Sequence, residues 1–67
     1  MNNFGDRLRF LRLTRELSED ELAQAAQIHA ATVKRIERRG IRPNLSTVLK
    51  LARALNVAPG LLLGNMP

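Results

Sequence analysis

Five basic side chains lie close together in the stretch 34–42 and are the residues best suited to chemistry: Lys34, Arg35, Arg38, Arg39 and Arg42. Ammonium and guanidinium groups donate hydrogen bonds to phosphate oxygens, so a dense cluster of them attracts a polyanion, most commonly a nucleic acid. The charge is also unevenly divided. Residues 22–67 carry seven basic residues and one acid, whereas residues 1–21 carry four basic residues and five acids. A solvated basic surface is the alternative that charge alone leaves open.

No set of residues predicts a catalytic, metal or cofactor site. Ser18 and His29 have no acid arranged with them. The chain has 67 residues, one histidine and no cysteine, which excludes a thiolate zinc site and leaves little room for an enclosed substrate pocket. Phe4 and Phe10 are the only aromatic residues, which disfavours binding of single strands by base stacking. We therefore expect no enzyme, no cofactor and no metal.

The sequence predicts neither a membrane span nor a secretion signal. No apolar run approaches the ~20 residues that cross a bilayer, and the N-terminus has no apolar signal region. The absence of cysteine fits a reducing compartment. We therefore expect a cytoplasmic protein with no membrane partner.

The apolar spacing predicts one all-α domain over residues 1–67, built from five short helices. Phe4, Leu8 and Leu11 recur at helical spacing and indicate a first helix over about residues 3–15. The later helices are expected at about residues 19–26, about 30–39, 45–55 and from Pro59 onward. The apolar residues of the fourth helix that follow the helical period are Leu45, Val48, Leu51, Ala52 and Leu55. Leu62 and Leu63 are the expected core contribution of the fifth helix.

Capping residues mark where these helices begin and end. Ser18 and Glu21 fit a capping box, in which each side chain hydrogen-bonds the backbone N–H of the other. Asn44 fits the N-cap of the fourth helix, and Asn56 fits its left-handed C-cap. The stretch 40–43, which begins with glycine and ends with proline, predicts a loop.

Several runs of residues, taken together, resemble the Cro/C1-type (XRE) helix-turn-helix family, which includes phage repressors and restriction–modification controller proteins. They are Phe4–Arg9, Leu11–Arg12, Leu17–Ala23, Ile28, Thr32–Arg38, Pro43–Thr47 and Lys50–Leu55. The resemblance covers about residues 4–64. It implies a five-helix, lambda-repressor-like DNA-binding domain. Its second and third helices form the helix-turn-helix motif, at about residues 19–38, and the third helix enters the DNA major groove.

The resemblance also implies which side chains meet the DNA. The base-facing positions are Ala30, Ala31, Lys34 and Arg35. The phosphate-facing positions are Glu19, Thr32, Arg38, Arg39 and Arg42. Arg35 is the best base reader because its guanidinium can pair bidentately with guanine, and Lys34 either reads a base or holds a phosphate. The two alanines offer only methyl groups, so indirect readout of DNA shape gains weight.

Four positions depart from the family's usual residues. Glu19 stands where glutamine is common, and its carboxylate either repels a phosphate or caps the helix. Gln27 stands where a left-handed glycine is common, so the turn is either strained by roughly 1 kcal/mol or differently shaped. His29 replaces a hydroxyl cap and is either a poor cap that reaches a phosphate when protonated or a plain surface residue. Arg39 precedes Gly40, so the third helix is expected to end one residue late.

A structural ion pair is implied between Arg12 and Glu37. These residues occupy positions that form a partly buried pair in the family. Glu37 is the only acid among residues 22–67, which makes a specific role for it credible.

Apolar residues outside the expected core predict a surface for self-association. Phe10 and Leu13 lie roughly opposite the core face of the first helix, at ~100° per residue. Leu61 stands where relatives favour an acid. The candidate dimer surface consists of Phe10, Leu13, Leu61, Leu62, Leu63 and Met66. We expect a homodimer through the C-terminal region, with ordinary exposed hydrophobic residues as the alternative.

The predicted function is that of a sequence-specific regulator of transcription that binds double-stranded DNA as a homodimer on an inverted repeat. Such a regulator, of repressor or controller type, would act in a bacterial cytosol or nucleoid or in a phage-infected cell. The alternative is an antitoxin or adaptor module that holds a protein partner, a toxin or another regulator, and binds DNA weakly. A third reading is a protein that coats nucleic acid without sequence preference.

Overall fold

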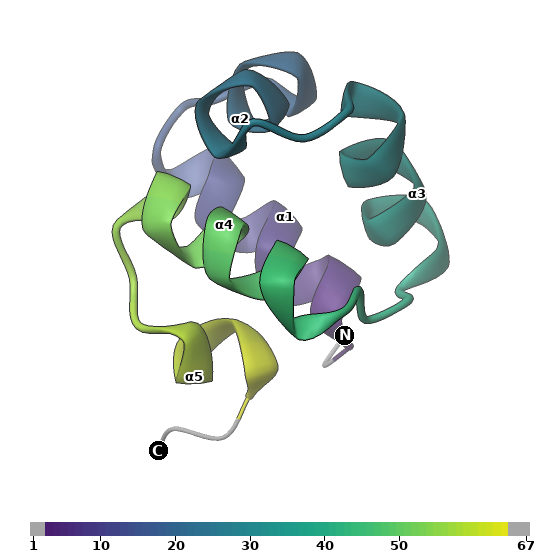
Figure 1. Ribbon diagram of the computed structural model, residues 1–67, viewed down its shortest axis with the longest axis vertical. Helices are drawn as coiled ribbons and strands as arrows, with labels where there is room; N and C mark the ends of the chain where they lie inside the picture. Colours follow the sequence, from purple (N-terminus) through teal and green to yellow (C-terminus); the bar gives the residue numbers. More distant parts are fainter. Residues whose placement is uncertain (1–2, 65–67) are drawn as a thin grey trace.

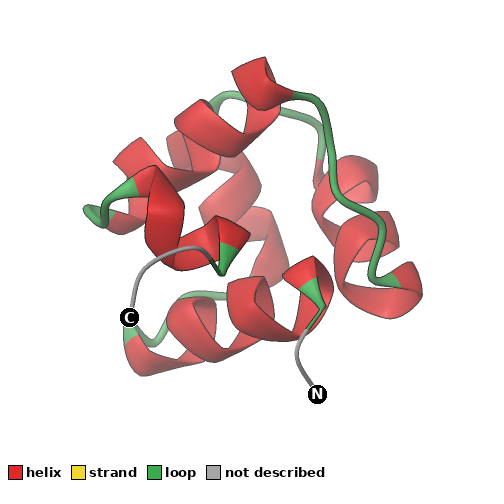
Figure 2. Cartoon of the chain, turned by 90° about the horizontal axis from the view of Figure 1, so that it is seen from below, coloured by secondary structure: helices red, strands yellow, loops and turns green. Residues whose placement is uncertain are grey.

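The computed structural model describes residues 3–64, which form five helices joined by short loops (Figures 1 and 2). The helices are α1 (Phe4–Thr14), α2 (Glu19–Ala26), α3 (Ala30–Arg39), α4 (Leu45–Leu55) and α5 (Pro59–Leu63). None of residues 3–64 lies in a strand. The all-α prediction is confirmed, and the first helix is one residue shorter at each end than the sequence predicted.

Side-chain caps fix the starts of three helices. Asn3 accepts a hydrogen bond from the backbone N–H of Asp6 at the start of α1, and Asn44 accepts one from Thr47 at the start of α4. Ser18 and Glu21 form the predicted capping box at α2, with hydrogen bonds of 2.7 and 3.0 Å. At α3, His29 makes no such bond, so it does not cap the helix with its side chain.

Left-handed residues end the helices and set the turns. Gln27 closes α2 with a φ of 60°, so the turn keeps the left-handed conformation that a glycine adopts without strain. Gly40 closes α3 and Asn56 closes α4 in the same region of backbone conformation, as predicted. Glu16, in the turn between α1 and α2, also has a positive φ of 57°, which the sequence analysis did not predict.

One hydrophobic core holds the five helices together. Its fully buried members are Leu8, Leu22, Val33, Val48, Leu51, Leu55 and Leu62. In Figure 1, α4 lies in front of α1. Helix α4 contacts α2 and α5, and helix α1 contacts α3 and α5. Burial of these side chains supplies the main driving force for folding.

The sequence placed Leu62 both in the core and on the candidate dimer surface. Its exposed fraction is 0%, because α5 turns this side chain into the core, so the core prediction is confirmed and the dimer-surface prediction is wrong. Leu45 shares the helical spacing of the buried residues of α4, but it is 63% exposed. Met66, the last member of the predicted dimer surface, lies outside the described residues.

The first turn of α1 lies very close to the end of α3. A Cβ atom added at Gly5 would clash with the backbone carbonyl oxygen of Ile36 and would lie 3.0 Å from Cα of Gly40. A helix side chain of any size is therefore excluded at this position. The close approach is one of the features that orient α3 relative to the rest of the domain.

Candidate nucleic-acid interface

The exposed face of α3 gathers most of the basic cluster. A shallow hollow of about 380 Å³ is lined by Ala31, Lys34, Arg35, Arg38 and Arg39. Their spacing of three and four residues places them on one face of the helix. Val33 and Ile36 lie on the opposite face, in the core, so burial of these two residues fixes the direction in which the cations point.

A second hollow adjoins the first at Arg35. It has a volume of about 310 Å³ and is lined by Thr32, Arg35, Ile36, Ile41, Pro43, Asn44 and Thr47. The start of α4 therefore lies beside Arg35 at this hollow. This helix start was not predicted as part of the interface, although a capping residue next to a basic loop could have indicated it.

The remaining predicted DNA-contacting residues lie around these two hollows in different environments. Arg42 is exposed in the loop between α3 and α4. Thr32 is half-buried at the second hollow. Ala30 is also half-buried and packs against the core, so it offers less surface than Ala31. Glu19 belongs to α2, and its side chain is 20% exposed.

Two ion pairs connect α2 to the basic face of α3. Lys34 Nζ lies 3.5 Å from Asp20 Oδ1, and Arg38 Nη2 lies 3.5 Å from Glu19 Oε1. Within the described stretch 3–64, Arg35, Arg39 and Arg42 have no carboxylate within 4.0 Å. The sequence analysis did not predict these pairs, because residues 19–20 and 34–38 are brought together only by the packing of α2 on α3.

A buried ion pair fixes α3 against α1. Arg12 Nε donates to Glu37 Oε2 at 2.7 Å, and Arg12 Nη2 donates to Glu37 Oε1 at 2.9 Å. Arg12 Nη1 also donates to the carbonyl oxygen of Leu17 at 2.8 Å. Hydrogen bonding to Glu37 raises the pKa of Arg12 above its ordinary value, and the charges of Glu37 and Glu19 add to this effect while burial opposes it.

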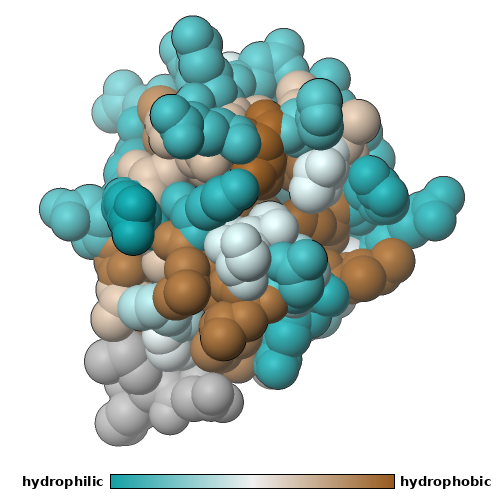
Figure 3. Space-filling model, viewed as in Figure 1, coloured by the Kyte–Doolittle hydropathy of each residue, from teal (hydrophilic) through white to brown (hydrophobic). Residues whose placement is uncertain are grey.

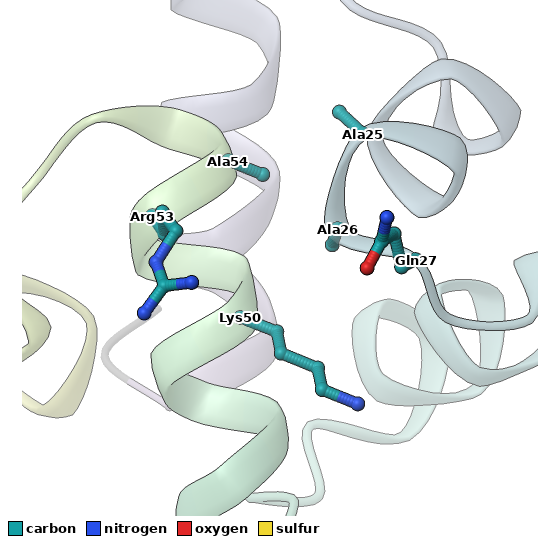
Figure 4. Close-up of a pocket in the computed structure, with 6 residues that line it drawn as sticks. All are labelled: Ala25, Ala26, Gln27, Lys50, Arg53 and Ala54. Carbon is teal, nitrogen blue, oxygen red and sulfur yellow. The ribbon is translucent and has the colours of Figure 1, made fainter.

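A third hollow, of about 330 Å³, lies between α2 and α4 (Figure 4). Its small residues are Ala25, Ala26 and Ala54, and its polar side chains are Gln27, Lys50 and Arg53. Figure 4 shows Lys50 and Arg53 extending from α4 in different directions, so the hollow does not bring its charged groups to one point. We assign it no role.

The described stretch 3–64 has no group of three or more histidine, cysteine, aspartate or glutamate residues that could hold a metal ion. Likewise, none of its helices is long and apolar enough to span a membrane. The α3 face therefore remains the candidate site with the strongest chemistry.

A family model described as a helix-turn-helix domain matches residues 3–63, which is almost the entire described stretch. The chain belongs to the XRE-like helix-turn-helix family of transcription regulators. The structure shows the family's motif in α2, the turn 27–29 and α3. The predicted family and fold are thereby confirmed.

Individual relatives agree with this assignment. The chain is 42% identical over 59 residues to the HTH-type transcriptional repressor RghR of Bacillus subtilis (strain 168); the match covers 85% of this chain and 43% of RghR, less than half of its length. The structure of the restriction-modification controller protein C.AhdI from Aeromonas hydrophila is 39% identical, with a TM-score of 0.83, over 88% of this chain and 89% of that one. The DNA-binding domain of the P22 c2 repressor is 28% identical, with a TM-score of 0.84, over 94% and 86%.

Proposed function

We propose that this chain binds double-stranded DNA at a specific sequence, with α3 in the major groove, and regulates transcription as a repressor or controller. The observation that carries the proposal is the gathering of Lys34, Arg35, Arg38 and Arg39 on the exposed face of one helix. That helix follows α2 and a short turn, the arrangement that inserts a helix into the major groove. RghR is a transcriptional repressor and C.AhdI is a restriction-modification controller protein, and the similarity to both supports the regulatory role.

Arg35 is the proposed main base reader. It borders both hollows of the interface and has no carboxylate within 4.0 Å in the described part of the chain. Its fork of donors fits the two acceptors that guanine presents in the major groove. Ala31 and Lys34 lie beside it in the first hollow, and Ala30 contributes what its half-buried methyl group exposes.

Phosphate contacts are proposed around this centre. Arg38 and Arg39 extend the basic face of α3, and Arg42 adds a cation from the following loop. Thr32 lies near the start of α4, whose first backbone N–H groups can also bind a phosphate. Glu19 lies 3.5 Å from Arg38, but its carboxylate cannot donate a hydrogen bond to a phosphate.

A homodimer on an inverted repeat is the proposed assembly. Figure 3 shows hydrophobic side chains gathered over α4 and α5, whereas the face over α2 is mostly hydrophilic. Leu45 and Leu49 on α4 and Leu61 on α5 are exposed, and Leu63 is half-buried. Since α4 and α5 pack together, we propose that these leucines form the dimer surface in place of Leu62.

Selection from a randomised duplex library, followed by sequencing of the retained DNA, tests this function. We expect an enriched inverted repeat with half-site centres about ten base pairs apart. Binding that depends on salt without enrichment of any sequence would contradict the proposal and support non-specific coating instead. A regulator of transcription must reach the DNA, so we propose that the protein is located in the cytoplasm.

An adaptor or antitoxin role is the second candidate. Phe10 is 65% exposed, and Leu13, one turn along α1, is exposed beside it. This pair is a candidate contact for a protein partner, a toxin or another regulator. If the duplex library yields no enriched sequence, changing Phe10 and Leu13 to serine and measuring the binding of a defined partner becomes the deciding experiment.

A further inference from the structure

Two carboxylates of α2 lie against the basic face of α3. Glu19 and Asp20 are the first two residues of α2, and they lie 3.5 Å from Arg38 and Lys34 respectively. These partners are two of the four basic residues of α3. Two of the five cations that the proposed function assigns to DNA thus already have a counterion within the protein.

The helix-turn-helix unit as a whole is electrically neutral. Residues 19–39 contain four basic residues and four acids, so the formal charge of +5 resides in the rest of the chain. Two of the four acids have other tasks, because Glu21 closes the capping box and Glu37 binds Arg12. Glu19 and Asp20 are therefore the acids that neutralise the interface itself.

We propose that Glu19 and Asp20 are internal counterions of α3, which a DNA phosphate must displace, and that they hold down the affinity of the interface for DNA of any sequence. The inference rests on the proposed function. Binding without sequence preference draws almost all of its free energy from the neutralisation of phosphates by cations. A phosphate that approaches Lys34 or Arg38 competes with a carboxylate already in place.

The pair of Asp20 and Lys34 has the geometry of a contact that DNA can displace, whereas in the other pair Arg38 is 67% exposed but Glu19 only 20%. Asp20 is 73% exposed, and a separation of 3.5 Å between exposed charges makes a weak contact that a phosphate can replace. The buried pair of Arg12 and Glu37, with two hydrogen bonds, is of the opposite kind. Removing the exposed carboxylate of Asp20 should therefore alter DNA binding without unfolding the domain.

The test compares three variants of the full chain, Asp20→Asn, Glu19→Gln and Glu16→Gln. Each adds the same unit of charge, but Glu16 is exposed after α1 and makes no ion pair with α3. Affinity for a random-sequence duplex is measured over a series of salt concentrations, and the melting temperature of each variant is recorded first. The charge of Glu19 also acts on Arg12, so Asp20→Asn is the more specific of the two α2 variants.

We expect Asp20→Asn and Glu19→Gln to bind the random duplex about two- to fivefold more tightly at low salt, because one ion pair between α2 and α3 no longer has to be broken. The salt slope should steepen by up to about 0.9, since one more cation is free to release a counterion from the DNA. Glu16→Gln should give clearly smaller changes. Equal changes in all three variants would overturn the inference, because total charge would then explain them.

A second comparison isolates the pairing. In a Lys34→Ala background, Asp20→Asn should gain much less affinity than in the wild-type chain, because its partner is already gone. An undiminished gain would overturn the pairing. The duplex library tests the proposed function separately: enrichment without any special effect of Glu19 or Asp20 removes this inference alone. Failure of the wild type and every variant to bind any duplex removes both.

Discussion

The guanidinium of Arg12 on α1 and the carboxylate of Glu37 on α3 face each other through two parallel hydrogen bonds of 2.7 and 2.9 Å. Their side chains are only 9% and 3% exposed. A third hydrogen bond from Arg12 to the carbonyl of Leu17 ties the chain before α2 to the same point. One arginine thus fixes the position of the segment before α2 relative to α3.

Glu37→Ala is therefore expected to destabilise the fold strongly. It leaves the buried Arg12 cation without its partner, which costs about 3–5 kcal/mol in the free energy of unfolding. Urea unfolding followed by circular dichroism measures the change. Glu16→Ala, which removes an exposed acid, is the control and should change stability by less than about 0.5 kcal/mol. An unfolding midpoint for Glu37→Ala equal to that of the wild type would contradict the structural role.

The pH dependence of this pair follows from the raised pKa of Arg12. A cation whose pKa is raised by folding contributes stability below its ordinary pKa and loses that contribution only as the pH rises through the raised value. The contribution of Arg12 is therefore expected to persist through the alkaline range in which lysines titrate. Unfolding midpoints of the wild type and Glu37→Ala, compared across that range, should keep a constant difference. A gap that closes there would contradict the raised pKa.

Gly5→Ala is expected to destabilise the domain, although alanine favours helices. Its Cβ would clash with the carbonyl oxygen of Ile36, and overpacking against backbone typically costs about 1–3 kcal/mol. Thermal unfolding measures the loss. Arg9→Ala, at an exposed position of the same helix, is the control and should leave the melting temperature nearly unchanged. A Gly5→Ala protein as stable as the control would show that α1 and α3 can move apart.

Much of this fold could be predicted from the sequence because local signals and burial agree. Ser18, Asn44 and Asn56 cap or end helices as their side chains and backbone preferences require. The exposure of Leu45 and the full burial of Leu62 depend on more than local signals. Helical spacing identifies an apolar face, but whether a neighbouring helix covers its ends depends on how α4 and α5 cross, and spacing carries no information about that.

The candidate site was less predictable than the fold. The sequence predicted a dense basic cluster over residues 34–42, and the structure gathers Lys34, Arg35 and Arg38 of this cluster on one face of α3. Their pairing with Glu19 and Asp20 depends on the packing of α2 against α3, which sequence spacing does not specify. The position of the start of α4 beside this face likewise depends on tertiary contacts alone.

Gln27→Gly is expected to stabilise the chain. Gln27 has a φ of 60°, where a side chain is disfavoured and glycine is not, so the gain should be roughly 0.5–1 kcal/mol before the greater freedom of glycine in the unfolded chain is subtracted. Gln27→Ala is the matched control, because it removes the side chain's polar group but keeps the Cβ atom. A Gln27→Gly variant no more stable than Gln27→Ala would show that the strain of the left-handed turn does not exceed the entropy cost of glycine.

Arg35→Ala and Arg39→Ala are expected to affect DNA binding in different ways. Loss of a base-reading arginine should cost about 1–3 kcal/mol and blur one position of the selected site. Loss of a phosphate contact should weaken binding to all sequences alike and flatten the salt slope by about one unit. Titrations of single-base variants of the selected duplex measure both effects. A uniform loss across all variants for Arg35→Ala would remove Arg35 from the base-reading role.

Leu49→Lys and Leu62→Ala separate the proposed dimer surface from the core. Leu49 is exposed on α4, so a lysine there should leave the melting temperature of the domain almost unchanged while opposing association of two copies. Leu62 is fully buried, and its truncation should cost about 2–5 kcal/mol of folding stability. Sedimentation at several protein concentrations should show a dimer for the wild type and a monomer for Leu49→Lys. A wild-type chain that stays monomeric at high concentration, with and without its DNA site, would contradict the proposed assembly and leave Leu45, Leu49 and Leu61 as ordinary exposed residues.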